Sequence, residues 1–119
     1  MAFTIAVVHG PEFLLVEAKG HASFGDMCGL VDFVRTTAEN HGHLRAILDL
    51  RNVEIAFSFT DHLALGSHAA HQLRGMSRVA SVVDPRLRVG TSEKAAQKMG
   101  LALRTFTDID EAMRWVVEK

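Results

Sequence analysis

The stretch HLRAILDL, residues 43–50, decides the fold class of this 119-residue chain. From Leu44 to Leu50 apolar side chains predominate, without the strict polar–apolar alternation of a strand that has one face in water. Such a run is typical of a central strand that is buried on both faces of a sheet. After a polar loop, residues 60–73 (TDHLALGSHAAHQL) predict a helix with Thr60 as its N-cap. A buried strand followed by a helix predicts an α/β domain.

The alternation of strands and helices extends in both directions from this stretch. Further strands are predicted at residues 3–8 and 13–20, which the turn signal HGPE joins as an antiparallel pair, and at 77–83 and 102–106. Further helices are predicted at 23–40, 91–100 and 108–119, with Ser23, Thr91 and Asp108 as N-caps. The order β-β-α-β-α-β-α-β-α predicts a single α/β domain over residues 1–119, with a mixed, mostly parallel five-stranded sheet and four helices.

Helical periodicity predicts which side chains pack on the sheet. In the first helix the expected inward stripe holds Phe24, Met27, Cys28, Val31, Val34 and Ala38. In the second helix the expected inward residues are Leu63, Gly66, Ala70 and Leu73, and the small residues among them permit close packing. Because Cys28 falls inside the first stripe, we expect it to be a buried, unreactive thiol.

Composition excludes several classes of function. A hydrophobic fraction of 48% and a charged fraction of 23% are ordinary for a globular domain, and a net charge of -1 argues against a general nucleic-acid binder. The single cysteine cannot form an internal disulfide, which suits a reducing compartment. Residues 1–13 lack the basic region of a signal peptide and an apolar run long enough for a membrane span, so we expect a cytoplasmic protein.

The segment FSFT, residues 57–60, lies where a strand leads into a helix, and it allows two interpretations. In the first, Phe57 and Phe59 close the edge of the sheet and Thr60 caps the helix. In the second, the rings and the hydroxyls of Ser58 and Thr60 form a pocket or partner surface at the carboxyl edge of the sheet. A phosphate on Ser58 or Thr60 would lie at a helix N-terminus, where backbone N–H groups favour an anion.

Two further groups are candidates for binding. Phe33 points away from the inward stripe of its helix and, with Leu30 beside it, predicts an apolar contact for a dimer or a ligand. Arg86 and Arg88 precede a helix that opens with Thr91 and Ser92, a pattern that predicts an anion site. Because the spacing is neither the P-loop pattern nor the dinucleotide fingerprint, an ordinary capped loop is the alternative.

Neither a metal site nor a catalytic site is predicted. His68 and His71 share one face of the second helix and His62 lies elsewhere, with no carboxylate or thiolate suitably placed in that segment, so we expect solvated histidines. Ser58, Asp61 and His62 lie within one helical turn, a spacing that does not by itself make a nucleophile–base relay. The sequence therefore predicts no enzyme activity and no cofactor.

The runs HLRAILDL, SRVASVVD (77–84), EKAAQKMG (93–100) and LRTFTDIDEAMRWV (103–116) give the chain a family likeness. From about Phe13 to Val117 it resembles the SpoIIAA-like branch of the STAS superfamily. The resemblance implies a mixed sheet with helices, similar to anti-sigma-factor antagonists and to CRAL-TRIO lipid-binding domains. In the antagonists an Asp-Ser-x-Gly motif follows the central strand, and a partner kinase phosphorylates its serine. Here Ser58 matches the serine, while Phe57 replaces the aspartate and Thr60 the glycine.

This resemblance, with the FSFT segment, leads to two functional hypotheses. The first is a non-enzymatic regulatory module that acts through protein–protein contact, with a homodimer as one form. The alternative is a small-molecule or lipid-binding domain, with an apolar pocket near the carboxyl edge of the sheet and the side chains of Phe33, Phe57 and Phe59. Exposure of Ser58 or Thr60 on a flat patch favours the first, and a closed apolar cavity favours the second.

Overall fold

Five strands form one mixed sheet, whose strand order is the order of the chain. The computed structural model describes residues 2–87 and 90–118. Its elements are β1 (Thr4–His9), β2 (Leu14–His21), α1 (Phe24–His41), β3 (Arg45–Glu54), α2 (Phe59–Gln72), β4 (Arg78–Val82), a 3-10 turn η1 (Pro85–Leu87), α3 (Thr91–Lys98), β5 (Leu103–Phe106) and α4 (Ile109–Val117). β1 pairs antiparallel with β2, and every other pair is parallel. The predicted element order and fold class are confirmed.

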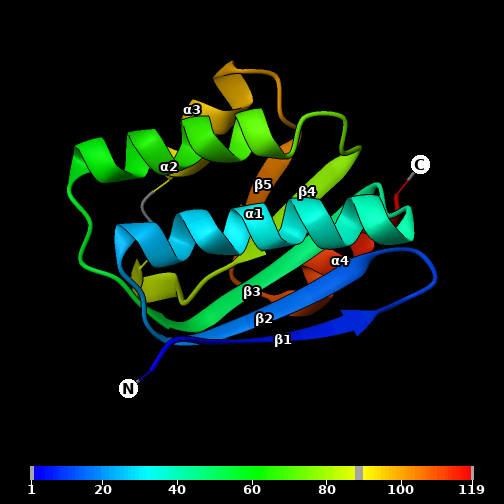
Figure 1. The fold of residues 1–119 in the computed structure, drawn as a ribbon, viewed down its shortest axis with the longest axis horizontal. Helices are drawn as coiled ribbons and strands as arrows, with labels where there is room; N and C mark the ends of the chain where they lie inside the picture. Colours follow the sequence, from blue (N-terminus) through cyan, green and yellow to red (C-terminus); the bar gives the residue numbers. More distant parts are fainter. Residues whose placement is uncertain (1, 88–89, 119) are drawn as a thin grey trace.

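The helices cover the two faces of the sheet unequally. Because β2 to β5 lie side by side in chain order, right-handed crossovers place α1, α2 and α3 on the same face. Figure 1 shows these helices together on one side of the strands, with α4 apart from them behind the sheet. α4 contacts β3, β4 and β5. Among the described residues, no helix is long and apolar enough to cross a bilayer.

The central strand β3 contributes to both hydrophobic cores. Ala46 and Leu48 belong to the larger cluster, under α1, α2 and α3, whereas Ile47 packs in a smaller cluster with Ala112 and Val116 of α4. Burying a leucine or isoleucine side chain contributes about 1.5–3 kcal/mol, so a strand buried on both faces anchors the whole domain. The expectation of a two-sided central strand is thus confirmed.

Two helix starts differ from the prediction. The N-cap of α2 is Ser58, not Thr60, because Ser58 has extended backbone and Asp61 lies three residues later to complete a capping box, whereas Leu63 occupies that place after Thr60. The N-cap of α3 is Gly90, in the left-handed region at φ 82, and Thr91 is the first helical residue. At α1 the predicted N-cap Ser23 is confirmed and forms a capping box with Asp26, and Asp108 caps α4 as predicted.

Most of the predicted inward residues of α1 and α2 are buried, but each buried face is rotated slightly from the predicted stripe. In α1 the stripe runs through Leu30, which is only 1% exposed, whereas Phe24 lies near the surface. Cys28 is half-buried rather than buried; burial, followed by the charge of Asp32, raises the pKa of its thiol, which keeps it protonated. In α2 the buried residues include Leu65 and Ala69, and Leu63 is exposed.

Close packing between α2 and α3 depends on Gly66. A Cβ atom at this position would lie 2.4 Å from the backbone oxygen of Ser92 and 2.8 Å from the Cβ of Ala95. The prediction that a small residue permits close approach is confirmed here, and α3 is the partner that the sequence did not identify. This contact holds α3 beside the first half of α2.

Candidate functional site

The two phenylalanines of the FSFT segment have different surroundings. Phe57 is half-buried against the main core, and its ring lies 6.0 Å from that of Phe24 and 5.5 Å from that of His62. Phe59, in the first turn of α2, is 68% exposed. Phe57 therefore closes the sheet edge, as the first interpretation expects, while Phe59 offers its ring to solvent, as the second expects.

Ser58 is exposed and lies at the positive end of α2. Its hydroxyl oxygen accepts a hydrogen bond from the backbone N–H of Asp61 at 3.1 Å, and the Asp61 carboxylate accepts one from the backbone N–H of Ser58 at 3.1 Å. A phosphate on Ser58 would gain the free N–H groups of the helix start, but it would meet the negative charge of Asp61. Modification would therefore change both the helix cap and the local charge.

An open groove lies between the exposed sides of α2 and α3, and we call it the α2–α3 groove. It has a volume of about 270 Å3 and is lined by Phe59, Leu63, Gly90, Thr91, Lys94, Ala95 and Lys98. Leu63 is 39% exposed, and both lysines are exposed. The groove thus combines an apolar floor with two cations, which suits a segment that carries an apolar anchor and acidic neighbours.

The lysines and Leu63 were not predicted as site residues. Lys94 and Lys98 are one helical turn apart and share a face, a signal that the sequence does contain. The prediction that Leu63 faces inward is wrong, because the buried stripe of α2 runs through Leu65, Ala69 and Leu73 and leaves Leu63 exposed.

Hydrogen bonds fix α3 against α2 and involve one of the predicted anion-binding residues. The Ser92 hydroxyl donates to the backbone oxygen of His62 at 2.8 Å, and the Nδ1 atom of His62 lies 3.3 Å from the same hydroxyl. Ser92 therefore lies in the contact between the helices and has its hydrogen atom engaged there.

Arg86, another predicted anion-binding residue, is paired with Asp84. Its Nε and Nη2 atoms donate to the two carboxylate oxygens at 3.1 and 2.8 Å, and hydrogen bonds from the Arg86 side chain and backbone lower the pKa of Asp84 to about 2. Arg88 lies outside the described residues. These contacts favour the alternative of an ordinary loop, and the anion site stays a prediction.

A hollow is present at the carboxyl edge of the sheet, where the carrier hypothesis expects a pocket. Its volume is about 110 Å3, and its lining includes Met27, Leu50, Ile55, His62 and Leu65. Pockets for drug-sized ligands measure about 300–1,000 Å3, so this hollow has room for a few water molecules and not for a lipid.

A polar bridge joins α1 and α2 and corrects one prediction about the histidines. The carboxylate of Asp32 accepts hydrogen bonds from His68 Nε2 at 2.7 Å and Gln72 Nε2 at 2.6 Å. The bond from Gln72, followed by that from His68, lowers the pKa of Asp32. His68 is thus half-buried and bonded across two helices, because helix packing supplies the carboxylate that its own segment lacks. His71 is exposed, as expected.

The predicted apolar pair on α1 is separated by the fold. Leu30 packs in the main core, which removes it as a surface contact, whereas Phe33 is 39% exposed. The reason is the rotation of the inward stripe, since Leu30 lies three residues after Met27 and four before Val34 on the buried face. A contact through Phe33 alone stays a prediction.

Comparisons with known proteins bear on the fold and the family. A family model described as SpoIIAA-like matches residues 13–117. An uncharacterised DUF3478-family protein with a SpoIIAA-like fold from Shewanella loihica PV-4 is 17% identical, with a TM-score of 0.60 over 96% of this chain and 93% of that one. An anti-sigma factor antagonist from Mycobacterium paratuberculosis is 14% identical, with a TM-score of 0.64 over 98% and 96%.

A third similar structure is the anti-sigma factor antagonist SpoIIAA in its unphosphorylated form. It is 15% identical, with a TM-score of 0.57 over 97% of both chains. No curated protein matches this chain in sequence. At these identities the structural matches show a shared fold.

Proposed function

Because the chain belongs to the SpoIIAA-like family, we propose that it is a non-enzymatic regulatory module that binds a partner protein through the surface around the N-terminus of α2. This surface consists of Ser58, Phe59 and the α2–α3 groove. Proteins of the same fold include anti-sigma factor antagonists, which supports a role in protein-mediated regulation.

The observation that carries the proposal is the exposed ring of Phe59. It is 68% exposed beside Leu63, although burying a phenylalanine side chain would contribute about 1.5–3 kcal/mol to folding. The stability of the fold therefore does not account for an aromatic side chain at position 59. Aromatic side chains on a surface, next to a groove that can exclude water, are typical anchors of protein interfaces.

Ser58 is the proposed point of control. It is exposed and directly precedes Phe59, and the family resemblance aligns it with the phosphorylated serine of the antagonists. A phosphate would add about 1.5–2 negative charges at the rim of the surface, beside Asp61. A partner that covers Phe59 would have to remove water from this charge, so we expect modification of Ser58 to weaken binding.

Phe57 makes the expected recognition more apolar than that of the antagonists. By the family resemblance it replaces the aspartate of their motif, and its half-buried ring lies next to those of Phe24 and His62. The surface therefore keeps the serine but loses one carboxylate. This difference supports a partner with an apolar anchor.

The proposal can be tested by placing a photo-crosslinking amino acid at position 59 in cells of the source organism. Position 33 is the matched control, because Phe33 is also an exposed aromatic residue but lies on α1. The expected result is a discrete crosslinked protein at position 59 that is absent at position 33. Its binding to the purified chain should then be lost in Phe59→Asp; equal capture at both positions would contradict the proposal.

The small-molecule alternative has less support, because the hollow near Phe57 is only about 110 Å3 in volume. Native mass spectrometry distinguishes the hypotheses: a bound mass that disappears on denaturation would favour a carrier. The same spectrum tests the predicted homodimer.

A further inference from the structure

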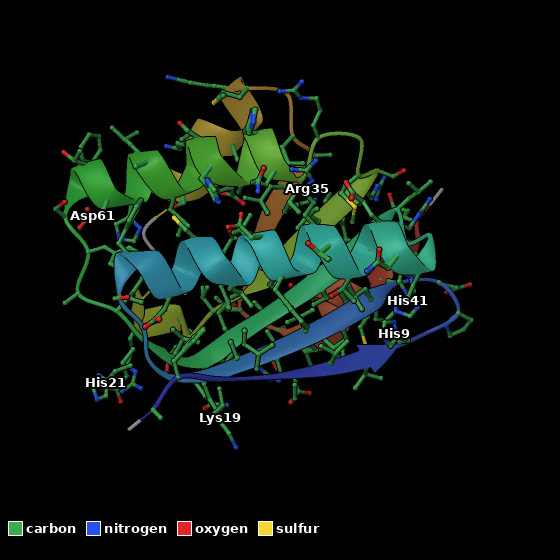
Figure 2. All side chains as sticks on the ribbon, viewed as in Figure 1. His9, Lys19, His21, Arg35, His41 and Asp61 are labelled. Carbon is green, nitrogen blue, oxygen red and sulfur yellow. The ribbon has the colours of Figure 1, made fainter. Side chains whose placement is uncertain are left out.

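Three histidines from separate segments meet at the end of the sheet opposite Ser58. His9 ends β1, His41 ends α1, and His43 lies in the loop that leads to β3. Figure 2 shows His9 and His41 close together at one end of the molecule, and Asp61, in the first turn of α2 beside the proposed partner surface, at the other. The topology brings His9 to the other two, since 34 positions separate His9 from His43.

The distances define a compact cluster. The ring centroids of His9 and His41 are 4.4 Å apart, those of His9 and His43 are 5.4 Å apart, and those of His41 and His43 are 6.5 Å apart. The Nδ1 atom of His9 and the Nε2 atom of His43 form a hydrogen bond of 3.2 Å, in which one nitrogen donates its hydrogen to the other, and a change of tautomer frees both nitrogens for a metal ion. Because this nitrogen–nitrogen distance is much shorter than the distance between ring centres, the two rings meet nitrogen to nitrogen.

No carboxylate forms an ion pair with these three imidazoles in the described part of the chain, where the histidine–carboxylate ion pairs involve His21 and His68. A neutral imidazole has a free lone pair, which is the form that binds metal ions.

We propose that His9, His41 and His43 form a binding site for a divalent transition metal ion of the zinc or nickel class. Zinc binds imidazole nitrogen at about 2.0–2.1 Å, so two ligands of a tetrahedral ion lie about 3.3 Å apart, close to the spacing between His9 and His43. Imidazole is a preferred ligand for both metals.

His41 is the ligand that must move. Among residues 2–87 and 90–118, no three His, Cys, Asp or Glu side chains are already arranged to hold a metal ion. The His41 ring is exposed and its centre lies 4.4 Å from that of His9, so a change of rotamer can direct a nitrogen toward the pair. The three imidazoles would leave one coordination position for water.

Metal binding at this place would stabilise the domain. It would link the end of β1 to the end of α1. An ion that binds the folded chain but not the unfolded chain raises the melting temperature. The site is remote from Ser58 and Phe59, so the inference does not depend on the proposed function.

The test is a titration of the chain, without a polyhistidine tag, with ZnCl2 and NiCl2 by isothermal calorimetry and thermal unfolding. We expect one equivalent to bind with a Kd of about 10 μM or below, and Tm to rise by several degrees in a way that EDTA reverses. His9→Gln and His43→Gln should each weaken binding by about tenfold or more, and His41→Gln should weaken it as well. The matched control His71→Gln, at an exposed histidine of α2, should leave the affinity unchanged.

Two results of the titration would overturn the inference. One is an affinity that does not change in the His9→Gln/His43→Gln double variant, which would show adventitious binding to other surface histidines. The other is an absence of binding at about 100 μM metal. Should a variant fail to fold, imidazole 1H–15N spectra of the unmodified chain decide: zinc must shift the ring signals of the three cluster histidines, and shifts confined to the other four would overturn the inference.

Discussion

The chain begins two neighbouring helices with the same pattern, Ser-Phe-x-Asp, and the two copies differ in what surrounds them. Ser23 and Asp26 form a capping box at α1 with hydrogen bonds of 2.9 and 3.0 Å, and Ser58 and Asp61 form one at α2 with two bonds of 3.1 Å. The ring of Phe24 lies 6.0 Å from that of Phe57, whereas the ring of Phe59 faces solvent beside the α2–α3 groove.

This comparison distinguishes the residues that start a helix from those that we expect to bind a partner. A capping box is a folding device wherever it occurs, so neither serine is a candidate for control on that ground alone. What distinguishes Ser58 is the exposed aromatic residue next to it and the two-cation groove behind that residue. The start of α1 therefore serves as a built-in control for the start of α2.

The largest effects on stability are expected when Gly66 of α2 and Gly29 of α1 are each replaced by alanine. Gly66→Ala should destabilise the domain by about 1–3 kcal/mol, because a Cβ atom 2.4 Å from the Ser92 backbone oxygen must displace α3. Gly29→Ala in α1 should stabilise it by about 0.5–1 kcal/mol, since nothing lies within 4 Å of the added atom and alanine favours helix. Denaturant unfolding of both variants measures the difference. If Gly66→Ala instead stabilises the domain as Gly29→Ala does, α2 and α3 are not in close contact.

Replacement of either capping serine should destabilise the domain to the same extent. Ser23→Ala and Ser58→Ala each remove a side-chain cap, so each should lower the free energy of unfolding by about 1 kcal/mol. Chemical denaturation of the two variants at one pH checks this. A loss at Ser58 far greater than at Ser23 would mean that Ser58 has a structural role that the capping box does not explain.

The bridge between the two helices predicts a smaller, pH-dependent effect. The folded pKa of Asp32 is below its usual value, so its charge stabilises the fold above the unfolded pKa of about 3.9, and this contribution is lost as the pH falls through the folded pKa. Asp32→Asn should therefore be less stable than the unmodified chain at pH 6, and the difference should shrink below pH 4. Unfolding curves across this range test it, and a difference that is independent of pH would contradict the assignment.

Replacement of Phe59 should have the smallest effect on stability and a large effect on binding of the partner protein. Phe59→Ser should change the free energy of unfolding by no more than about 0.5 kcal/mol, because the ring is mostly exposed. Its affinity for the crosslinked partner should fall by about 10- to 100-fold, the loss typical of a buried aromatic anchor. Phe33→Ser, on α1, should leave this affinity unchanged, although it should cost more stability than Phe59→Ser because Phe33 is only 39% exposed. A stability loss above about 2 kcal/mol in Phe59→Ser would place the ring in the core instead.

The order of elements could be predicted because the sequence carries it locally. The apolar run of β3 and the Ser23–Asp26 box each depend on residues a few positions apart. The start of α2 was placed at Thr60 because either hydroxyl can cap a helix, although the spacing of Ser58 and Asp61 favours the earlier start.

The surroundings of the site could not be predicted, because distant segments supply them. Asp32 reaches His68 from another helix, 36 positions away, and Ser92 meets His62 across 30 positions. The contact of His9 with His43 likewise depends on how β1 and α1 end at the same place. Patterns within one helix carry no information about such contacts.

The affinity of the crosslinked partner for Ser58→Asp and Ser23→Asp tests the central claim most directly. Aspartate caps a helix about as well as serine, so both variants should remain as stable as the unmodified chain while each gains one negative charge. Ser58→Asp should weaken binding by about tenfold or more, because the added charge lies at the rim of the partner surface, and Ser23→Asp should bind as the unmodified chain does. Equal affinity for the two variants would contradict the claim that the start of α2 is a regulated recognition surface.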